Sequence, residues 1–317
     1  MIERKLFRGK LFREGKDMVK INKDSLVKMS VQGNISPPKT GPYRINTHGY
    51  ASTLPGVGGI TYNVKVGSSA MGWVADHVEP GVSIKVKDEQ DNSGLQTFAC
   101  VGNEAVVISG SAKGRKGVVI GKHGGIEHVI VQFDDDTLDK LAIDDKIAIK
   151  AFGTGLKLTD HPDISIKNLD PDLLEKLPIK ETSEGIEVPV TTKIPAHLMG
   201  SGIGAPTTHR GDYDITTHDP EAYEKYNLKD LKLGDLVLLE DSDNEFGREY
   251  LKGARSIGVV IHSDCVVTGH GPGVTTLLTS KKPVIEGSFD DKANIANYLD
   301  LEKLEEENKQ QDQDKDK

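Results

Sequence analysis

Apolar residues alternate with polar ones along many short stretches of the chain, and glycine, proline or acidic residues separate these stretches. Residues 62–66 and 82–86 each place three apolar side chains on one face, because successive side chains of a strand point to opposite faces. The segments at 186–194, 235–240 and 256–267 carry further strand patterns in the second half. The pattern therefore predicts a mostly β protein built from short strands.

Helical signals are few and short. Asp170 precedes Pro171 in DPDLLEKL, and Asp219 precedes Pro220 in DPEAYEKYNL. An aspartate cap followed by proline in the first turn is typical of a helix start, so we predict a short helix at each place. The last residues, 301–317, are polar and charged. We expect them to form a disordered tail, because such a composition buries too little apolar surface to become ordered.

The segment from about 108 to 157 predicts a small SH3-like barrel of short strands joined by glycine or aspartate turns. Within it, residues 114–133 resemble the KOW element of ribosomal and transcription proteins. Residues 110–150 contain seven basic and seven acidic side chains. A neutral barrel lacks the positive field that binds phosphate groups. An RNA- or ribosome-associated module is therefore the least favoured of the functions considered below.

The chain has 317 residues, which is long for one hydrophobic core and sufficient for two. We predict an N-terminal β domain over 1–165, which includes the barrel, and a C-terminal β-rich domain over 166–300. The following loops would line a cleft between them: 56–59, 76–81, 200–214 and 264–273.

Charge and cysteine content narrow the choice of partners. The formal net charge is −9, and acidic residues are spread along the chain. This balance disfavours nucleic acid or a membrane surface as the main partner, since phosphate binding needs clustered positive charge. No apolar run approaches the roughly 18 residues of a membrane span. The two cysteines form no CxxC motif, so we expect a reducing, cytoplasmic location. A homo-oligomer is compatible with the sequence.

Three long blocks carry a family resemblance: GGITYNVKVGSSAMGWVADHVEPGVSI, TKIPAHLMGSGIGAPTTHRGDYDITTHDPEAYEKYNL and FGREYLKGARSIGVVIHSDCVVTGHGPGVTTLLTS. They resemble the bacterial and archaeal proteins grouped as domain of unknown function 4438. The resemblance covers nearly the whole chain. It implies an architecture of small β domains and no activity, because the family carries no agreed one.

Glycine-rich loops supply candidate ligand-binding residues. Residues 200–204 follow a predicted strand, but their GxGxG spacing and the lack of a following helix disfavour a dinucleotide site. Turn formation accounts for such glycines, and the alternative is a set of backbone N–H groups that holds an anion. On that alternative the ligand-binding candidates are Gly58, Gly59, Gly200, Gly202, Gly204 and Gly271.

Two histidines each stand two residues before a carboxylate, in His77-Val-Glu79 and in His262-Ser-Asp264. On a strand, the two side chains of each pair would project from the same face. Their tips could bind one metal ion or perform proton transfer, and the alternative is an ordinary structural hydrogen bond. Cys265 would face the apolar side, so we interpret it as a small buried hydrophobic residue.

More polar side chains follow in the loops at 209–218 and 264–273. A dense polar cluster costs folding free energy unless its groups are satisfied, which favours a functional site there. The catalytic candidates are His262, Asp264, His270 and Arg248. The candidate metal ligands are His77, Glu79, His209, Asp212 and Asp214.

These candidates favour an enzyme that acts on a small polar metabolite by histidine and carboxylate chemistry. Hydrolysis, isomerisation and elimination all stay open, and a divalent metal ion is the candidate cofactor. The alternative is a binding or accessory protein whose loops hold a small anion without turning it over. Metal analysis of the purified protein distinguishes the two, since a stoichiometric metal favours the enzyme.

Overall fold

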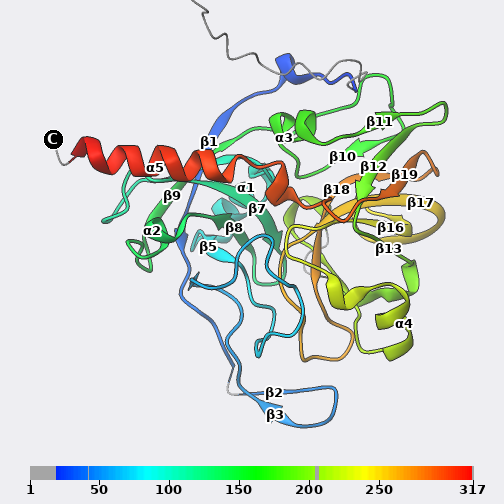
Figure 1. Cartoon of the computed structure of the whole chain (residues 1–317), viewed down its shortest axis with the longest axis horizontal. Coiled ribbons are helices and arrows are strands. Elements are labelled where there is room, and N and C mark those ends of the chain that lie inside the picture. Colours follow the sequence, from blue (N-terminus) through cyan, green and yellow to red (C-terminus); the bar gives the residue numbers. More distant parts are fainter. Residues whose placement is uncertain (1–18, 42, 204–206, 316–317) are drawn as a thin grey trace, which may run out of the picture.

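The computed structural model describes residues 19–41, 43–203 and 207–315. Two seven-stranded sheets make up most of this structure, with two smaller sheets and a few short helices beside them. Figure 1 shows these elements along the chain. The prediction of a mostly β protein with a small barrel is confirmed.

The first sheet closes into a barrel. Its strands are ordered β1-β9-β6-β7-β8-β5-β4, and β1 also pairs with β5, so that six strands form a closed ring and β4 extends it. These strands are β1 (Met29–Ile35), β4 (Ile60–Thr61), β5 (Gly81–Lys85), β6 (Glu104–Val107), β7 (Lys116–His123), β8 (His128–Gln132) and β9 (Lys146–Ala151). The barrel therefore spans 29–151, because β1 and β5 close a ring that residues 108–157 alone do not complete.

The second sheet is open and follows the order β13-β16-β17-β18-β15-β14, with β10 paired to β18. Its strands are β10 (Ser165–Ile166), β13 (Thr192–Ile194), β14 (Met199–Ile203), β15 (Tyr213–Ile215), β16 (Leu236–Asp243), β17 (Glu249–Val260) and β18 (Gly273–Ser280). The strand predicted over 256–267 ends at Val260, because the chain then turns away toward the barrel. The alternation expected for His262 and Asp264 was therefore wrong.

The remaining elements lie around these two sheets. The smaller sheets contain β2 (Arg44–Ile45), β3 (Ala51–Ser52), β11 (Lys180–Glu181), β12 (Ile186–Val190) and β19 (Ile285–Phe289). The 3-10 turns are η1 (Lys23–Ser25), η2 (Ala196–Leu198), η3 (Thr208–Arg210), η4 (Leu228–Asp230) and η5 (Ile295–Asn297). The helices are α1 (Glu89–Phe98), α2 (Asp135–Leu138), α3 (Pro171–Lys176), α4 (Pro220–Lys225) and α5 (Leu301–Lys315). Asp170 caps α3 and Asp219 caps α4, as the sequence predicts.

The barrel and the second sheet share one hydrophobic core. Val118 and Ile120 of β7 belong to the same buried cluster as Ile257 and Leu277 of the second sheet. At the junction, the Thr275 hydroxyl accepts a hydrogen bond from the Lys122 main-chain N–H at 3.2 Å and donates to the Lys122 carbonyl at 3.1 Å. This packing fixes the β7–β8 hairpin against β18, and the site described below lies where they meet. Among the described residues, no helix is long and apolar enough to cross a bilayer.

The C-terminal segment is ordered, so the prediction of a disordered tail was wrong for residues 301–315. Figure 1 shows α5 in red lying along the barrel, and its contacts are with β7. Leu301 and Leu304 pack against the hydrophobic core, and the buried Asn308 bonds both the N–H and the C=O of Lys116 at 2.8 Å. These positions lie on one face of the helix. The overall composition of the segment does not reveal this face.

Deletion of 301–317 is expected to lower the free energy of unfolding by about 2–4 kcal/mol, since it removes partly buried leucines and several hydrogen bonds. The deletion also uncovers Arg115, which is 1% exposed and donates to Asp312 on α5. Chemical denaturation measures the change. As a control, Lys303→Ala alters an exposed side chain of the same helix and should shift stability by less than about 0.5 kcal/mol. A deletion variant that unfolds like the full chain would contradict this account of α5.

Candidate functional site

Five histidines and four carboxylates gather at the junction of the barrel and the second sheet. Beside them lies a cavity of about 260 Å³. Its lining residues are Arg44, Val57, His77, His123, Gly124, Gly125, Ile126, Asp212, Asp214 and His270. They come from β2, from the loops before β4 and β5, from the β7–β8 hairpin, from the start of β15 and from the loop between β17 and β18. The fold therefore unites segments that are far apart in the sequence.

His123 ends β7 and is held by a carboxylate. Its Nδ1 lies 2.6 Å from Oε1 of Glu79, so the imidazole donates from Nδ1 and keeps Nε2 free. A histidine held in this way by a carboxylate has the tautomer and orientation that metal ligands require. The side chain of His123 is 9% exposed and lines the cavity. The ring can therefore offer Nε2 to a ligand.

Glu79 is fully buried and organises this side of the site. Besides His123 it accepts hydrogen bonds from Nδ1 of His128 at 2.9 Å, from the hydroxyl of Ser83 at 2.5 Å and from the main-chain N–H of Gly58 at 2.6 Å. Burial alone would raise the pKa of Glu79, but His128 and His123 outweigh it and hold the pKa well below its usual range. Glu79 is therefore an ionised anchor and not a ligand that faces the cavity.

His262 lies two residues beyond β17 and is fully buried. Its Nδ1 is 2.8 Å from the carbonyl oxygen of Ser263, closer than the 3.3 Å to the N–H of Gly273, so Nδ1 carries the proton. Its Nε2 lies 2.8 Å from Oδ2 of Asp212. The other oxygen of Asp212 accepts from the N–H of Gly124 at 2.8 Å. The imidazole of His262 and the carboxylate of Asp212 are therefore each held by a main-chain hydrogen bond, and they point toward each other.

His123, Asp212 and His262 together form a compact donor set. One donor atom of each lies within 4.8 Å of the others, and the two imidazole centroids are 4.3 Å apart. Burial would lower the pKa of His262, but Asp212 and Asp214 raise it well above its usual value. Two histidines and one carboxylate match the ligand sets of catalytic zinc and of non-haem iron, which leave coordination positions open.

Asp214 occupies the middle of the cluster. Its Oδ2 is 2.9 Å from Nδ1 of His270 and 3.6 Å from Nε2 of His77, and its Oδ1 is 3.6 Å from Nε2 of His262. Burial would raise the pKa of Asp214, but the three histidines lower it far below its usual range. Burial would likewise lower the pKa of His77, whereas its bonds to Asp214 and Asp76 raise it. The cluster therefore places three histidine rings around one carboxylate.

The structure brings most of the predicted chemical residues into this cluster. Those that meet there are His77, Glu79, Asp212, Asp214, His262 and His270. The predicted pairs do not act as pairs: His77 bonds Asp76 and His270, and His262 bonds Asp212. The reason is that His77 lies in a loop with a positive φ of 59° and His262 lies beyond its strand, so neither has strand alternation.

Three predicted residues, Asp264, Arg248 and His209, have side chains whose partners lie outside the cluster or that belong to no donor set. The Asp264 carboxylate accepts from the Thr217 hydroxyl at 2.8 Å. Arg248 donates to the main-chain oxygens of Met199 and Gly200, the latter at 2.6 Å. These contacts give both side chains structural partners. Asp264 meets the cluster through its main-chain oxygen, which accepts from the His77 N–H at 3.2 Å.

The carbonyl oxygen of His209 accepts a hydrogen bond from the Lys122 ammonium at 2.8 Å. The ring of His209 does not belong to the donor set of His123, Asp212 and His262. Burial, with Lys122 and Lys167, lowers the pKa of His209 to about 4.

The predicted glycines support the site from behind. The Gly58 N–H donates to Glu79, and the Gly271 N–H lies 3.4 Å from Oδ2 of Asp214. Gly59 bonds the Ser36 carbonyl at 2.8 Å, and the Gly200 carbonyl accepts from Arg248. Gly202 lies within β14, and Gly204 lies outside the described residues.

Several site residues were not predicted. His123 and His128 belong to the HGGIEH hairpin of the barrel, which the sequence analysis considered only for RNA binding. In this hairpin two histidines flank a short turn that contains a pair of glycines. That pattern could have indicated a candidate site. Asp76 and Cys265 were also missed as a contact: the thiol is buried, as predicted, but its Sγ lies 3.1 Å from Oδ1 of Asp76.

Two family models match adjacent parts of the chain. Domain of unknown function (DUF4438), N-terminal, matches residues 43–175, and its C-terminal counterpart matches residues 176–299. The chain belongs to the DUF4438 family. This membership confirms the resemblance seen in the sequence.

A solved structure titled "Crystal structure of TM1086" is similar to this DUF4438 protein. It shares 52% identity with a TM-score of 0.85, over 89% of this chain and 99% of that chain. Comparison with curated proteins gave no match. This solved structure has the same fold as the chain.

Proposed function

We propose that this protein is a metal-dependent enzyme acting on a small polar metabolite. The observation that carries the proposal is the donor set of His123, Asp212 and His262. Both imidazoles have Nδ1 bonded to an oxygen. Nε2 of His123 is left for a ligand, whereas Nε2 of His262 bonds the carboxylate of Asp212, whose other oxygen accepts from a backbone N–H. Histidines held through Nδ1 by an oxygen are typical of metal ligands, and a bound ion is one way to satisfy buried polar groups.

The chemistry follows from the number of protein ligands. Three donors leave at least one coordination position of a divalent ion for water or substrate. An ion bound there would lower the pKa of bound water and polarise a substrate oxygen. Hydrolysis uses both effects and is the reaction that this arrangement supports best. Isomerisation and elimination use the second effect with a histidine as the base, and they stay secondary candidates.

The cavity supports a small, polar substrate. Its volume of about 260 Å³ lies below the range of roughly 300–1,000 Å³ typical of sites for drug-sized ligands. Arg44 lines the cavity with its side chain 51% exposed, and the backbone of Gly124–Gly125 lines another part. A guanidinium and the exposed backbone of Gly125 favour a substrate that carries a carboxylate, phosphate or carbonyl oxygen. Val57 and Ile126 complete the wall with apolar surface.

The test combines metal analysis with a substrate screen. The purified protein is stripped with chelator, reloaded with Zn²⁺, Mn²⁺ or Fe²⁺, and analysed for bound metal and for turnover of small esters, lactones, amides and phosphoesters. We expect at least one ion per chain and turnover that depends on it. Asp212→Asn should reduce both by at least about 100-fold, because it removes a charged ligand. Asp235→Asn is the control, since Asp235 is also buried but bonds Asn294 away from the site.

Two results would contradict the proposal. A protein that retains no metal after reloading has no metal centre. A protein that binds metal through Asp212 and turns over no member of the screen would instead favour the non-catalytic binder of small anions.

A further inference from the structure

We infer that the site is binuclear: a second divalent ion binds His77, Cys265 and His270, and Asp214 bridges it to the first. This inference rests on the proposed metal centre and adds a second ion to it. Two ions held by a shared carboxylate can bind both the attacking and the leaving oxygen of a hydrolytic reaction. The inference therefore narrows the reaction to hydrolysis of an oxygen-rich substrate.

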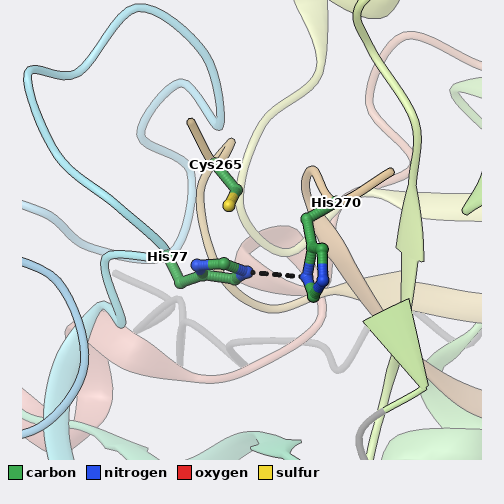
Figure 2. A group of neighbouring side chains, drawn as sticks. All are labelled: His77, Cys265 and His270. Carbon is green, nitrogen blue, oxygen red and sulfur yellow. Dashed lines mark hydrogen bonds between the residues drawn. The ribbon is translucent and has the colours of Figure 1, made fainter. Parts of the chain in front are cut away.

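The second donor set shares no residue with the first. One donor atom each of His77, Cys265 and His270 lies within 4.8 Å of the others. Figure 2 shows the imidazole of His77 pointing at Nδ1 of His270, with the Cys265 sulfur directed toward the His77 side of the pair. Nε2 of His77 and Nδ1 of His270 are 3.3 Å apart. Ligand atoms of one tetrahedral ion at about 2.0–2.3 Å from the metal have comparable separations.

His77 is oriented in the same way as His123. Its Nδ1 lies 2.9 Å from Oδ1 of Asp76, which leaves Nε2 for a ligand. Asp76 is itself fixed by Arg44, whose Nε lies 3.0 Å from Oδ2. The two donor sets therefore repeat one device, a carboxylate that holds Nδ1 of a ligand histidine from behind. In addition, Nε2 of His77 points toward His270 and Asp214, which a purely structural role for His77 does not explain.

Asp214 has the position of a bridge. Its Oδ1 faces Nε2 of His262, in the first set, at 3.6 Å. Its Oδ2 faces Nδ1 of His270 at 2.9 Å and Nε2 of His77 at 3.6 Å, in the second set. The two oxygens of the Asp214 carboxylate therefore lie near different donor sets. Carboxylate-bridged pairs of ions lie about 3.5–4 Å apart in two-metal enzymes.

The donor types indicate which metal the second position would take. A cysteine sulfur with two imidazoles is a soft set that favours zinc, cobalt or iron over magnesium or calcium. Cys265 is 4% exposed and its Sγ lies 3.1 Å from Asp76 Oδ1, so bulk solvent scarcely reaches the thiol. A simple hydrogen bond to Asp76 is the competing account of this thiol, and it places no metal beside the sulfur.

Cobalt loading separates the two accounts, because a cobalt ion bound to thiolate gives a near-ultraviolet charge-transfer band. The stripped full-length protein is titrated with Co²⁺, and bound metal is measured beside the spectrum. We expect two ions per chain and the band. Cys265→Ser should abolish the band, keep the first ion and weaken the second at least tenfold. Cys100→Ser is the matched control, since Cys100 is also buried but lies outside both sets.

Asp212→Asn distinguishes failure of this inference from failure of the proposed function. It should lose the first ion and keep the thiolate band, because Asp212 is not a donor to the second. One ion per chain, no band and an unchanged Cys265→Ser variant would overturn the second site and leave the first intact. No bound cobalt at all would overturn both.

Discussion

Replacement of Glu79 by alanine is expected to lower the free energy of unfolding by about 3–5 kcal/mol. The carboxylate is fully buried and accepts hydrogen bonds from two imidazoles, one hydroxyl and one main-chain N–H. Removal of one partner from a buried charged network leaves the others unpaired in a medium that solvates them poorly. Denaturant unfolding of the metal-free protein measures the loss separately from any effect on metal binding.

One further variant isolates the charge of Glu79. Glu79→Gln keeps the volume but turns an NH₂ group toward donors, and we expect a cost of about 1–3 kcal/mol. Because the folded-state pKa of Glu79 is lowered, its charge stabilises the fold at pH values above the ordinary glutamate pKa. That contribution is lost as the pH falls, so the difference between wild type and Glu79→Gln should shrink in acid.

Glu187→Ala is the control, since Glu187 pairs with Lys180 at the surface and should cost less than about 1 kcal/mol. A Glu79→Ala variant no less stable than this control would refute the anchoring role.

Replacement of Gly273 by alanine is expected to abolish metal binding at the first position without removing any ligand. Gly273 begins β18 and pairs with Asp214 of β15. A Cβ at this position would lie 2.0 Å from Oδ2 of Asp212 and 2.2 Å from Nε2 of His262. Both are far shorter than van der Waals contact, so the two ligands must separate. We expect metal affinity to fall at least about 100-fold, beyond the effect of an ordinary outer-shell change.

Gly94→Ala is the matched control for this substitution. Gly94 lies in α1, and no atom lies within 4 Å of its added Cβ. It should keep full metal binding and gain up to about 1 kcal/mol of stability from helix propensity. Calorimetric titration with Zn²⁺ compares the three proteins. Unchanged affinity in Gly273→Ala would show that Asp212 and His262 do not share an ion.

The local elements of the fold follow from the sequence, whereas the closure of the barrel does not. Alternation and aspartate–proline caps depend on neighbouring residues, so β12, β13, β16, part of β17 and helices α3 and α4 could be predicted. Closure of the barrel depends on pairing of β1 with β5 and β9, which are far apart in the chain. The packing of α5 depends on three residues of one face in an otherwise polar segment.

The sequence indicated several of the residues that gather in the cluster, but not their contacts. The choice of Asp212, Asp214 and His270 rested on the density of polar residues in loops, which does not depend on pairing, whereas His77 and His262 were chosen for their spacing from a carboxylate. Their partners could not be deduced, since they are set by the junction of two sheets. His123 arrives from the barrel hairpin and replaces Glu79 as the residue that faces the donors. A spacing rule based on strands could not find this, because His77 and His262 lie outside strands.

The most direct test of the metal centre is anomalous diffraction from crystals of the full-length protein loaded with Zn²⁺, with data collected on both sides of the zinc absorption edge. The account predicts a peak within about 2.0–2.3 Å of His123 Nε2, Asp212 and His262 Nε2, and a second near Cys265 and His270. Ordered imidazoles with no anomalous peak among them, at saturating zinc, would contradict it.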